Sequence, residues 1–209
     1  MRNPSAVTLL LIRHGETAGN ADGIIQHPDT PLNDNGLSQA TLLAKKLSFE
    51  YGIDTILTSD YTRALQTARK IADNNNSTIS VSSLLRERNF GKLRGTSYAE
   101  LGNLDVFSEN YTPPNGESWD KFHQRVDSAW EEIKKVKSEI NGTLAVVTHG
   151  LVLRSLIERK LTIAPGMVSP EFVVGNTSVT AIEGSPPWKV RDLASVDHLI
   201  SKTMANGIA

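Results

Sequence analysis

Short apolar runs alternate with longer stretches of helical periodicity along most of this 209-residue chain. The runs are rich in Val, Ile and Leu, and the stretches between them repeat apolar residues at spacings of three and four. Strands that alternate with helices favour a three-layer α/β domain built around a largely parallel sheet. No linker, repeat or low-complexity tract interrupts the pattern, and we therefore expect one domain over residues 1–209.

The individual elements can be predicted by residue range. Strands are expected at 7–12, 53–58, 79–85 and 144–147, and towards the C-terminus at 173, 178–182 and 188–192. Helices are expected at 32–48, 59–72, 117–139 and from about 151 to 160, with a short one near 97–102 inside an irregular segment, 91–116. Asn33 or Asn35 can cap the first helix, and Ser59 or Asp60 the second.

The composition removes several classes of function. The chain contains no cysteine, which excludes disulfides, thiolate metal sites and every mechanism with a cysteine nucleophile. Its formal net charge is −1, which argues against general binding to nucleic acid or membrane surfaces but leaves room for a local basic pocket. The apolar run 7–12 is shorter than the core of a secretory signal. We therefore expect a cytoplasmic protein whose partner is neither nucleic acid nor membrane.

Two histidines, each followed by glycine, stand directly after predicted strands: His14 after the first and His149 after the fourth. Arg13 closes the first strand run, Arg63 follows the second strand, and Glu87 follows the third. Ligands of such sheets bind at the carboxyl ends of the strands, and these side chains are therefore expected to meet in one site. A lone histidine after a strand is usually packed or capping, but two His-Gly pairs favour a functional interpretation.

These residue types suit the transfer of a phosphoryl group. The guanidinium groups of Arg13 and Arg63 match phosphate oxygens, and their charges disfavour protonation of His14. A neutral His14 can attack phosphorus and become a phosphohistidine. His149 and the arginines would stabilise charge on the transferring oxygens, while Glu87 could protonate the leaving oxygen and then deprotonate water.

Other chemistries have less support in the sequence. Two histidines and a carboxylate can hold zinc or non-haem iron, but neighbouring arginines would repel a cation, and no His-x-x-x-His or Asp-rich loop is present. No Gly-x-Gly-x-x-Gly run follows the first strand and no Walker-type loop occurs, which argues against dinucleotide and nucleoside triphosphate binding. We therefore expect neither a metal nor a cofactor.

The same positions resemble the motifs of the histidine phosphatase superfamily, the phosphoglycerate mutase-like group. The family signature is similar to the run Leu-Ile-Arg-His-Gly-Glu-Thr at 11–17, with Asn20 beyond it. Further segments resemble family motifs in the expected order, at 29–32, 36–40, 59–68, 85–91, 116–118, 147–150, 176–180 and 198–199. The resemblance implies a mixed, mostly parallel sheet with helices on both faces, and phosphoryl transfer without a metal.

The resemblance also implies a role for each matching position. His14 would be the phosphorylated nucleophile, Glu87 the acid, and the phosphoryl group would be bound by Arg13, Arg63 and His149. Further phosphate or substrate contacts are expected from Thr17, Asn20, Gln26 and Gly150.

Some positions depart from the family pattern. Ile24 stands where phosphatase relatives often have arginine, His27 stands where glycine is common, and Leu-Arg-Gly at 93–95 replaces Trp-Glu-Gly. We interpret these departures as bearing on the substrate rather than on the chemistry. His27 is expected on a surface loop, His123 to be structural or exposed, and the stripe of Trp119 and Trp130 to belong to the core.

We therefore predict a phosphatase that hydrolyses a small phosphomonoester, with a short cap-like insertion at about 91–116. Mutases of the family carry a longer basic and aromatic insertion, and a smaller cap should admit water more readily. The alternative is a cofactor-dependent phosphoglycerate mutase-type phosphoryl transferase. A non-catalytic phosphate-ester-binding regulator would be expected to lack a catalytic residue, and none is lost here. A homo-oligomer is compatible with the sequence, which sets no oligomeric state.

Overall fold

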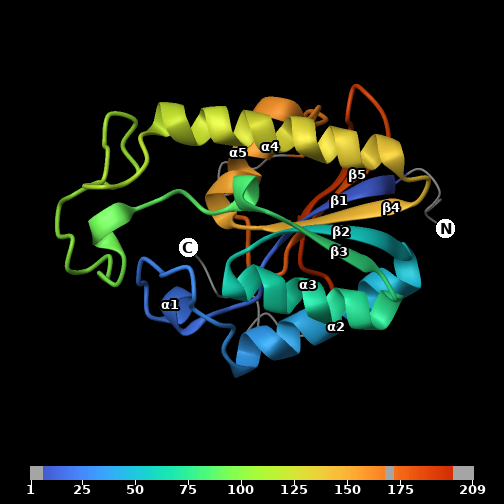
Figure 1. Cartoon of the computed structure of the whole chain (residues 1–209), viewed down its shortest axis with the longest axis horizontal. Helices are drawn as coiled ribbons and strands as arrows, with labels where there is room; N and C mark the ends of the chain where they lie inside the picture. The colour runs from blue at the N-terminus through green and yellow to red at the C-terminus, as the bar shows by residue number, and fades with distance from the viewer. Residues whose placement is uncertain (1–6, 168–171, 200–209) are drawn as a thin grey trace.

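The computed structural model describes residues 7–167 and 172–199, and within them six strands form one sheet in the order β3-β2-β4-β1-β5-β6 (Figure 1). The strands are β1 (Val7–Arg13), β2 (Ile53–Ser59), β3 (Thr78–Ser82), β4 (Thr143–Thr148), β5 (Val179–Glu183) and β6 (Val190–Ser195). The pairs β3-β2, β2-β4 and β4-β1 are parallel. The pairs β1-β5 and β5-β6 are antiparallel, and the sheet is therefore mixed but mostly parallel.

Helices cover both faces of this sheet, as Figure 1 shows. One face carries α2 (Asp34–Glu50) and α3 (Thr62–Asn75), and the other carries α4 (Trp119–Glu139) and α5 (Gly150–Lys160). A short helix, α1 (Ala18–Ala21), follows the first strand. The predicted three-layer α/β architecture is confirmed. No helix in the described ranges is both long and apolar enough to cross a membrane.

The first strand shows why its sequence is apolar throughout. Leu9 and Leu11 belong to the core cluster under α4 and α5, whereas Leu10 and Ile12 belong to the cluster under α2 and α3. Successive side chains of a strand point to opposite faces, and both faces of this strand are covered. The four side chains are at most 1% exposed.

Several predicted boundaries are wrong for identifiable local reasons. The third strand ends at Ser82, whose side chain accepts a hydrogen bond from Leu84 N and opens a 3-10 turn, Ser83–Leu85. No helix forms at 97–102, because the Glu100 carboxylate accepts hydrogen bonds from Ser97 N and Oγ and closes a turn there. The last strand starts at Val190 because Trp188 has a left-handed φ of 44°.

The C-terminal strand edge and the caps of two helices were also predicted. Val173 lies in no strand; the next carbonyl, that of Val174, instead accepts a hydrogen bond from the Arg13 side chain. Asn33 caps α2 through a bond from Gly36 N, as predicted. Neither Ser59 nor Asp60 caps α3, which starts after Tyr61.

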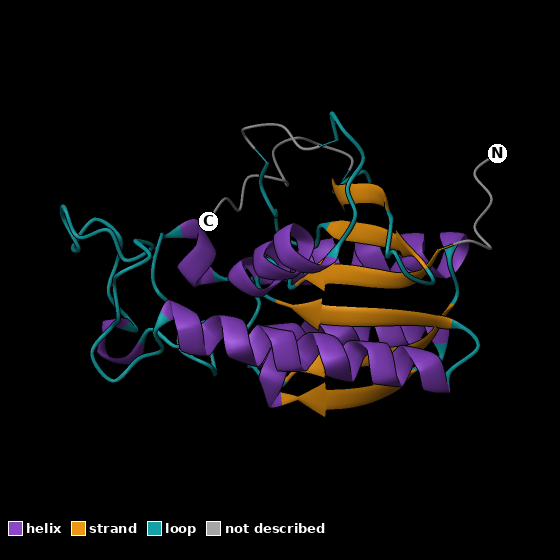
Figure 2. Ribbon diagram, turned by 90° about the horizontal axis from the view of Figure 1, so that it is seen from above, coloured by secondary structure: helices purple, strands orange, loops and turns teal. Residues whose placement is uncertain are grey.

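Residues 91–116 form a segment of turns at the carboxyl ends of the strands. Figure 2 shows these loops on the side towards which the parallel strands point. The segment begins with the 3-10 turn Gly91–Leu93 and packs through Val106 against Ile25 and Phe90. We call residues 91–116 the cap segment.

Candidate active site

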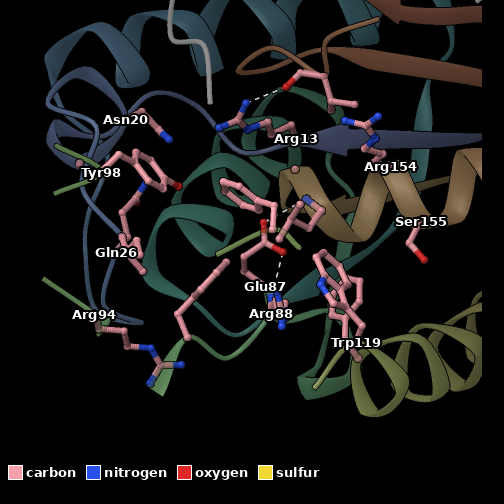
Figure 3. A pocket seen from close by; sticks show the side chains of 18 of the residues that line it. Arg13, Asn20, Gln26, Glu87, Arg88, Arg94, Tyr98, Trp119, Arg154 and Ser155 are labelled. Carbon is pink, nitrogen blue, oxygen red and sulfur yellow. Dashed lines mark hydrogen bonds between the residues drawn. The ribbon is translucent and has the colours of Figure 1, made fainter. Parts of the chain in front are cut away.

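The five predicted catalytic residues all lie where parallel strands end. Arg13 is the last residue of β1 and His14 follows it, while His149 follows β4 and precedes the first turn of α5. Arg63 lies in the first turn of α3, after β2. Glu87 follows the 3-10 turn after β3, and Figure 3 shows it facing the same cavity as Arg13.

Two hydrogen bonds fix the proton of the His14 ring. Nδ1 lies 2.7 Å from the carbonyl oxygen of Gly15, and Nε2 lies 3.2 Å from Nε of Arg63. A carbonyl can only accept a hydrogen bond and a guanidinium can only donate one. Nδ1 therefore carries the proton, and Nε2 presents its lone pair to the arginine.

Burial and charge keep this ring neutral. Burial lowers the pKa of His14 well below its usual value, and the charges of Arg63 and Arg13 lower it further. Burial also lowers the pKa of Arg63 to about 10, which leaves its guanidinium charged at neutral pH. The site therefore pairs a neutral imidazole with a cation.

His149 lies beside His14, with 5.1 Å between the ring centroids. Its Nε2 is 2.9 Å from Ser59 Oγ, and that oxygen also accepts a hydrogen bond from Tyr61 N at 3.3 Å. The Ser59 hydroxyl has one proton that it can donate to Nε2, and in that tautomer the ring proton of His149 lies on Nδ1. This Nδ1 is buried and has no partner among the described residues. Burial, followed by the charge of Arg63, holds the pKa of His149 well below its usual value.

One donor of the Arg13 side chain has no hydrogen-bond partner among the described residues. Its Nη1 donates to the carbonyl oxygen of Val174 at 2.6 Å, while its Nε is buried with no partner in the described part of the chain. A buried donor without a partner costs roughly 1–3 kcal/mol. Such groups call for an explanation in a folded protein, and an anionic ligand would supply their missing acceptor.

Backbone donors position the Glu87 carboxyl group. Oε1 accepts a hydrogen bond from Arg88 N at 2.9 Å, and Oε2 accepts one from Leu151 N at 3.1 Å. Gly150 passes close by: a Cβ added there would lie 3.9 Å from Glu87 Oε2 and 3.8 Å from Arg13 Cζ. The structure therefore brings Arg13, Glu87 and the Gly150 backbone together.

The three remaining predicted contacts divide into two groups. Asn20 and Gln26 line the cavity, as Figure 3 shows. Thr17 does not: it is fully buried, caps α1 by accepting a hydrogen bond from Asn20 N, and lies 2.9 Å from Gln26 Oε1. The structure places Thr17 behind Asn20 and Gln26, where it supports their positions.

The cavity in front of these residues has a volume of about 1260 Å³. Small-molecule sites commonly span about 300–1,000 Å³, and a phosphoryl group alone would fill little of this one. Its far walls come from the cap segment, α4 and α5, with Arg94, Tyr98, Phe107, Trp119, His123, Leu151 and Arg154 among the lining residues. The cavity therefore has room for a phosphate ester whose alcohol is considerably larger than the phosphate.

Part of this wall was not identified from the sequence. Tyr98 of the cap segment lines the cavity, and Figure 3 shows its ring beside Asn20 and Gln26. Burial and the Glu87 charge raise the pKa of Tyr98 and keep its phenol protonated. Trp119 lines the cavity as well as packing against the core, and its assignment to the core alone was therefore incomplete.

The other histidines have distinct surroundings. His123 lines the cavity, stacks against Trp119 and has Nδ1 3.1 Å from Ser155 Oγ. His27 is exposed, and its carbonyl oxygen accepts a hydrogen bond from Arg63. Within the described ranges, no group of three or more His, Cys, Asp or Glu side chains is arranged to hold a metal ion.

Comparisons with known proteins agree with this geometry. The model of the histidine phosphatase superfamily (branch 1) matches residues 9–190. Phosphoglycerate mutase-like protein 4 of Arabidopsis thaliana is 37% identical over 91% of this chain and 86% of its own length. A broad-specificity phosphatase of Saccharomyces cerevisiae is 32% identical over 92% of this chain and 87% of its own.

A solved structure leads to the same family. The alpha-ribazole phosphatase of Shigella flexneri has a TM-score of 0.76 and 29% identity, covering 90% of this chain and 96% of that one. The family model covers most of the chain, including all five of the residues predicted to be catalytic. This chain belongs to the histidine phosphatase superfamily, branch 1.

Proposed function

We propose that this protein is a phosphatase that hydrolyses a small phosphomonoester through a phosphohistidine on His14, without a metal ion. The observation that carries the proposal is the neutral His14 ring, whose Nε2 lone pair accepts a hydrogen bond from Arg63 Nε. A neutral imidazole is a nucleophile, and buried cations beside it stabilise the charge of a transferring phosphoryl group. A small phosphorylated metabolite as partner and a cytoplasmic location belong to the same proposal.

In the first step, Nε2 of His14 attacks phosphorus and the bond from phosphorus to the ester oxygen breaks. Arg63 Nε, which donates to Nε2 in the free protein, then donates to a phosphoryl oxygen instead. Arg13 Nε and, in the tautomer that carries the ring proton there, His149 Nδ1 supply further hydrogen bonds to these oxygens; neither atom has a partner among the described residues. Glu87, in its protonated form, gives its proton to the leaving alcohol oxygen.

In the second step, water attacks the phosphohistidine from the side that the alcohol has left. The Glu87 carboxylate accepts a proton from this water, the phosphorus–nitrogen bond breaks, and the electron pair returns to Nε2 of His14. Inorganic phosphate leaves, and both residues regain their starting protonation states. The backbone donors of Arg88 and Leu151 hold the Glu87 carboxyl group in place for both proton transfers.

A His14→Ala variant tests the nucleophile. We expect kcat to fall by about a thousandfold or more, while phosphate-ester binding persists because the arginines remain. Acid quench of the wild type during turnover of a labelled ester should trap an acid-labile phosphoryl group on His14. The matched control is His27→Ala, which removes an exposed histidine outside the cavity wall. Equal rates for His14→Ala and wild type, or no trapped label in repeated quenches, would contradict the proposal.

A Glu87→Gln variant tests the proton donor. Esters with poor leaving groups need protonation of the departing oxygen, whereas activated aryl phosphates do not. We expect kcat for alkyl phosphates to fall at least tenfold more than kcat for 4-nitrophenyl phosphate, an order-of-magnitude figure based on general acid catalysis. If both classes lost the same factor, Glu87 would not be the acid.

A mutase would return the phosphoryl group to a second position of the substrate rather than to water. Tyr98 and Phe107 of the cap segment are 38% and 45% exposed, and this open wall supports access of water to the phosphohistidine. Hydrolysis is therefore the proposed reaction. Conversion of 3-phosphoglycerate to 2-phosphoglycerate with a bisphosphoglycerate primer, at rates above hydrolysis, would establish the mutase alternative.

A further inference from the structure

The cavity wall contains five arginines. Four of them either lie beside His14 or already have protein partners for their guanidinium groups. Arg13 and Arg63 lie beside His14 at the strand ends. Arg88 is fully buried and donates to three carbonyl oxygens. Arg154 forms an ion pair with Glu158, with 2.8 Å between Nε and Oε1. The fifth is Arg94, which belongs to the cap segment.

Arg94 is a half-buried cation without a counterion. Its Nη2 donates to the Tyr61 hydroxyl oxygen at 3.1 Å. No carboxylate of the described residues lies within ion-pair distance of its guanidinium group. A guanidinium has five N–H donors, and most of those of Arg94 therefore remain available to a ligand in the cavity.

Tyr61 links Arg94 to the site of the chemistry. The Tyr61 ring meets the His149 ring edge to face, with 5.2 Å between centroids, and the Arg63 guanidinium carbon lies 5.2 Å from the Tyr61 centroid. Tyr61 therefore contacts Arg94 through its hydroxyl, and Arg63 and His149 through its ring. The charges of Arg94 and Arg63 are close enough to repel, because Arg94 contributes to lowering the pKa of Arg63.

We propose that Arg94 is a specificity-determining residue that binds a second anionic group, a carboxylate or a phosphate, on the alcohol part of the substrate. This inference rests on the proposed phosphatase function. An anion at this place would accept hydrogen bonds from the Arg94 fork and from the Tyr61 hydroxyl, which keeps its own proton to donate. It would also relieve the repulsion between Arg94 and Arg63. Figure 3 shows Arg94 at the rim of the cavity, on the side of Gln26 and away from Arg154.

The sequence is consistent with a role in selecting the substrate. Arg94 is the charged residue of the triplet Leu-Arg-Gly at 93–95, and it brings a positive charge to this part of the cavity wall. An acidic side chain here would repel an anionic alcohol, whereas arginine attracts it. The neighbouring Gly95 has a left-handed φ of 87° and donates to Ile25 O at 2.7 Å, which fixes the backbone next to Arg94.

The test compares esters that differ only in the second anion. Glycerol 3-phosphate and 3-phosphoglycerate share a three-carbon skeleton, and the second carries a carboxylate where the first has a hydroxymethyl group. We expect wild-type kcat/KM to be higher for 3-phosphoglycerate, and Arg94→Gln to lower it for this ester by about tenfold, chiefly through KM. The value for glycerol 3-phosphate should change by less than about twofold. Arg94→Lys should recover part of the loss, because it keeps the charge but not the fork.

Two further arms complete the design. A bisphosphate such as fructose 1,6-bisphosphate, compared with fructose 6-phosphate, shows whether the second anion is a phosphate rather than a carboxylate. Lys92→Gln is the matched control, because Lys92 is an exposed cation of the same turn outside the cavity wall. It should leave kcat/KM unchanged for every ester.

The following results would overturn the Arg94 inference or separate it from the phosphatase proposal. Equal losses for anionic and neutral esters in Arg94→Gln, or no loss for either, would overturn the inference, as would a wild type that prefers neutral alcohols. Dissociation constants measured on His14→Ala, with and without Arg94→Gln, test the same preference without turnover. If no phosphomonoester were hydrolysed but this binding preference held, the phosphatase proposal would fail and the Arg94 site would stand.

Discussion

Replacing Arg88 with methionine would test whether one buried cation holds the cap segment in place. The Arg88 side chain is 1% exposed, and its guanidinium donates to the carbonyl oxygens of Glu117, Val106 and Tyr111 at 3.1, 3.0 and 2.6 Å. Its guanidinium carbon lies 3.9 Å from the centroid of the Trp119 ring. Two of the three carbonyls belong to the cap segment and the third directly follows it.

The free energy of unfolding lost in Arg88→Met follows from these contacts. Methionine fills a similar space but donates no hydrogen bond, and three carbonyl oxygens lose their donor. Each lost bond costs roughly 1 kcal/mol net, which gives a loss of about 3 kcal/mol in the free energy of unfolding. The stacked cation adds up to about 2 kcal/mol when desolvated, but removal of a buried charge returns a similar amount. We therefore expect a net loss of about 3 kcal/mol for Arg88→Met.

The assay is urea unfolding at neutral pH, compared with Arg159→Met. Arg159 forms a partly exposed ion pair with Asp127 at 3.1 Å, and its loss should cost less than about 1 kcal/mol. The Arg88 backbone also holds Glu87, and kcat for alkyl phosphates should therefore fall in Arg88→Met. A loss below about 1 kcal/mol with unchanged kcat would refute the idea that Arg88 anchors the cap segment.

Three further predictions concern metal, pH and backbone spacing. EDTA should leave phosphatase activity intact, and a loss that added metal restores would contradict a metal-independent reaction. Burial and the charge of Lys46 lower the pKa of His198 to about 4; the folded state then binds fewer protons than the unfolded state, and up to about 3 kcal/mol of stability is lost as pH falls from 6.5 to 4. Urea unfolding across this range should show a shallower decline in His198→Gln, and parallel curves would count against the assignment. A Cβ at Gly36 would overlap the carbonyl oxygen of Glu16, and Gly36→Ala should therefore displace the loop after His14 and lower kcat by about tenfold or more; an unchanged kcat would show that the loop adjusts freely.

The parallel part of the sheet could be predicted because its strands carry a strong signal. Strands such as β1 and β4 are buried on both faces and therefore read as continuous apolar runs. The edge strand β6 has no such run: Arg191 and Asp192 lie within it, and its start depends on the left-handed Trp188. The strand order is a property of the crossovers between strands, which leave no trace in local periodicity.

The candidate site divides in the same way. Residues directly after parallel strands were predictable because topology brings strand ends to one edge, as with His14 and His149. Thr17 was expected at the phosphate, but the capping interactions of α1 turn its side chain away from the cavity. Arg94 and Tyr98 were not predicted to line the cavity, because the path of the cap segment depends on long-range contacts such as those made by Arg88.

The division between strand ends and cap segment has a functional meaning under the proposed mechanism. Burial makes His14 neutral and leaves Arg13 Nε and His149 Nδ1 without partners in the described chain, and these groups meet only the phosphoryl oxygens, which every phosphomonoester shares. The cap segment meets the alcohol, which differs between substrates and leaves before water attacks. Change at the strand ends would therefore remove the reaction, whereas change at Arg94 would redirect it. The strand-end residues therefore serve the phosphoryl group, and the cap segment serves the alcohol that distinguishes one substrate from another.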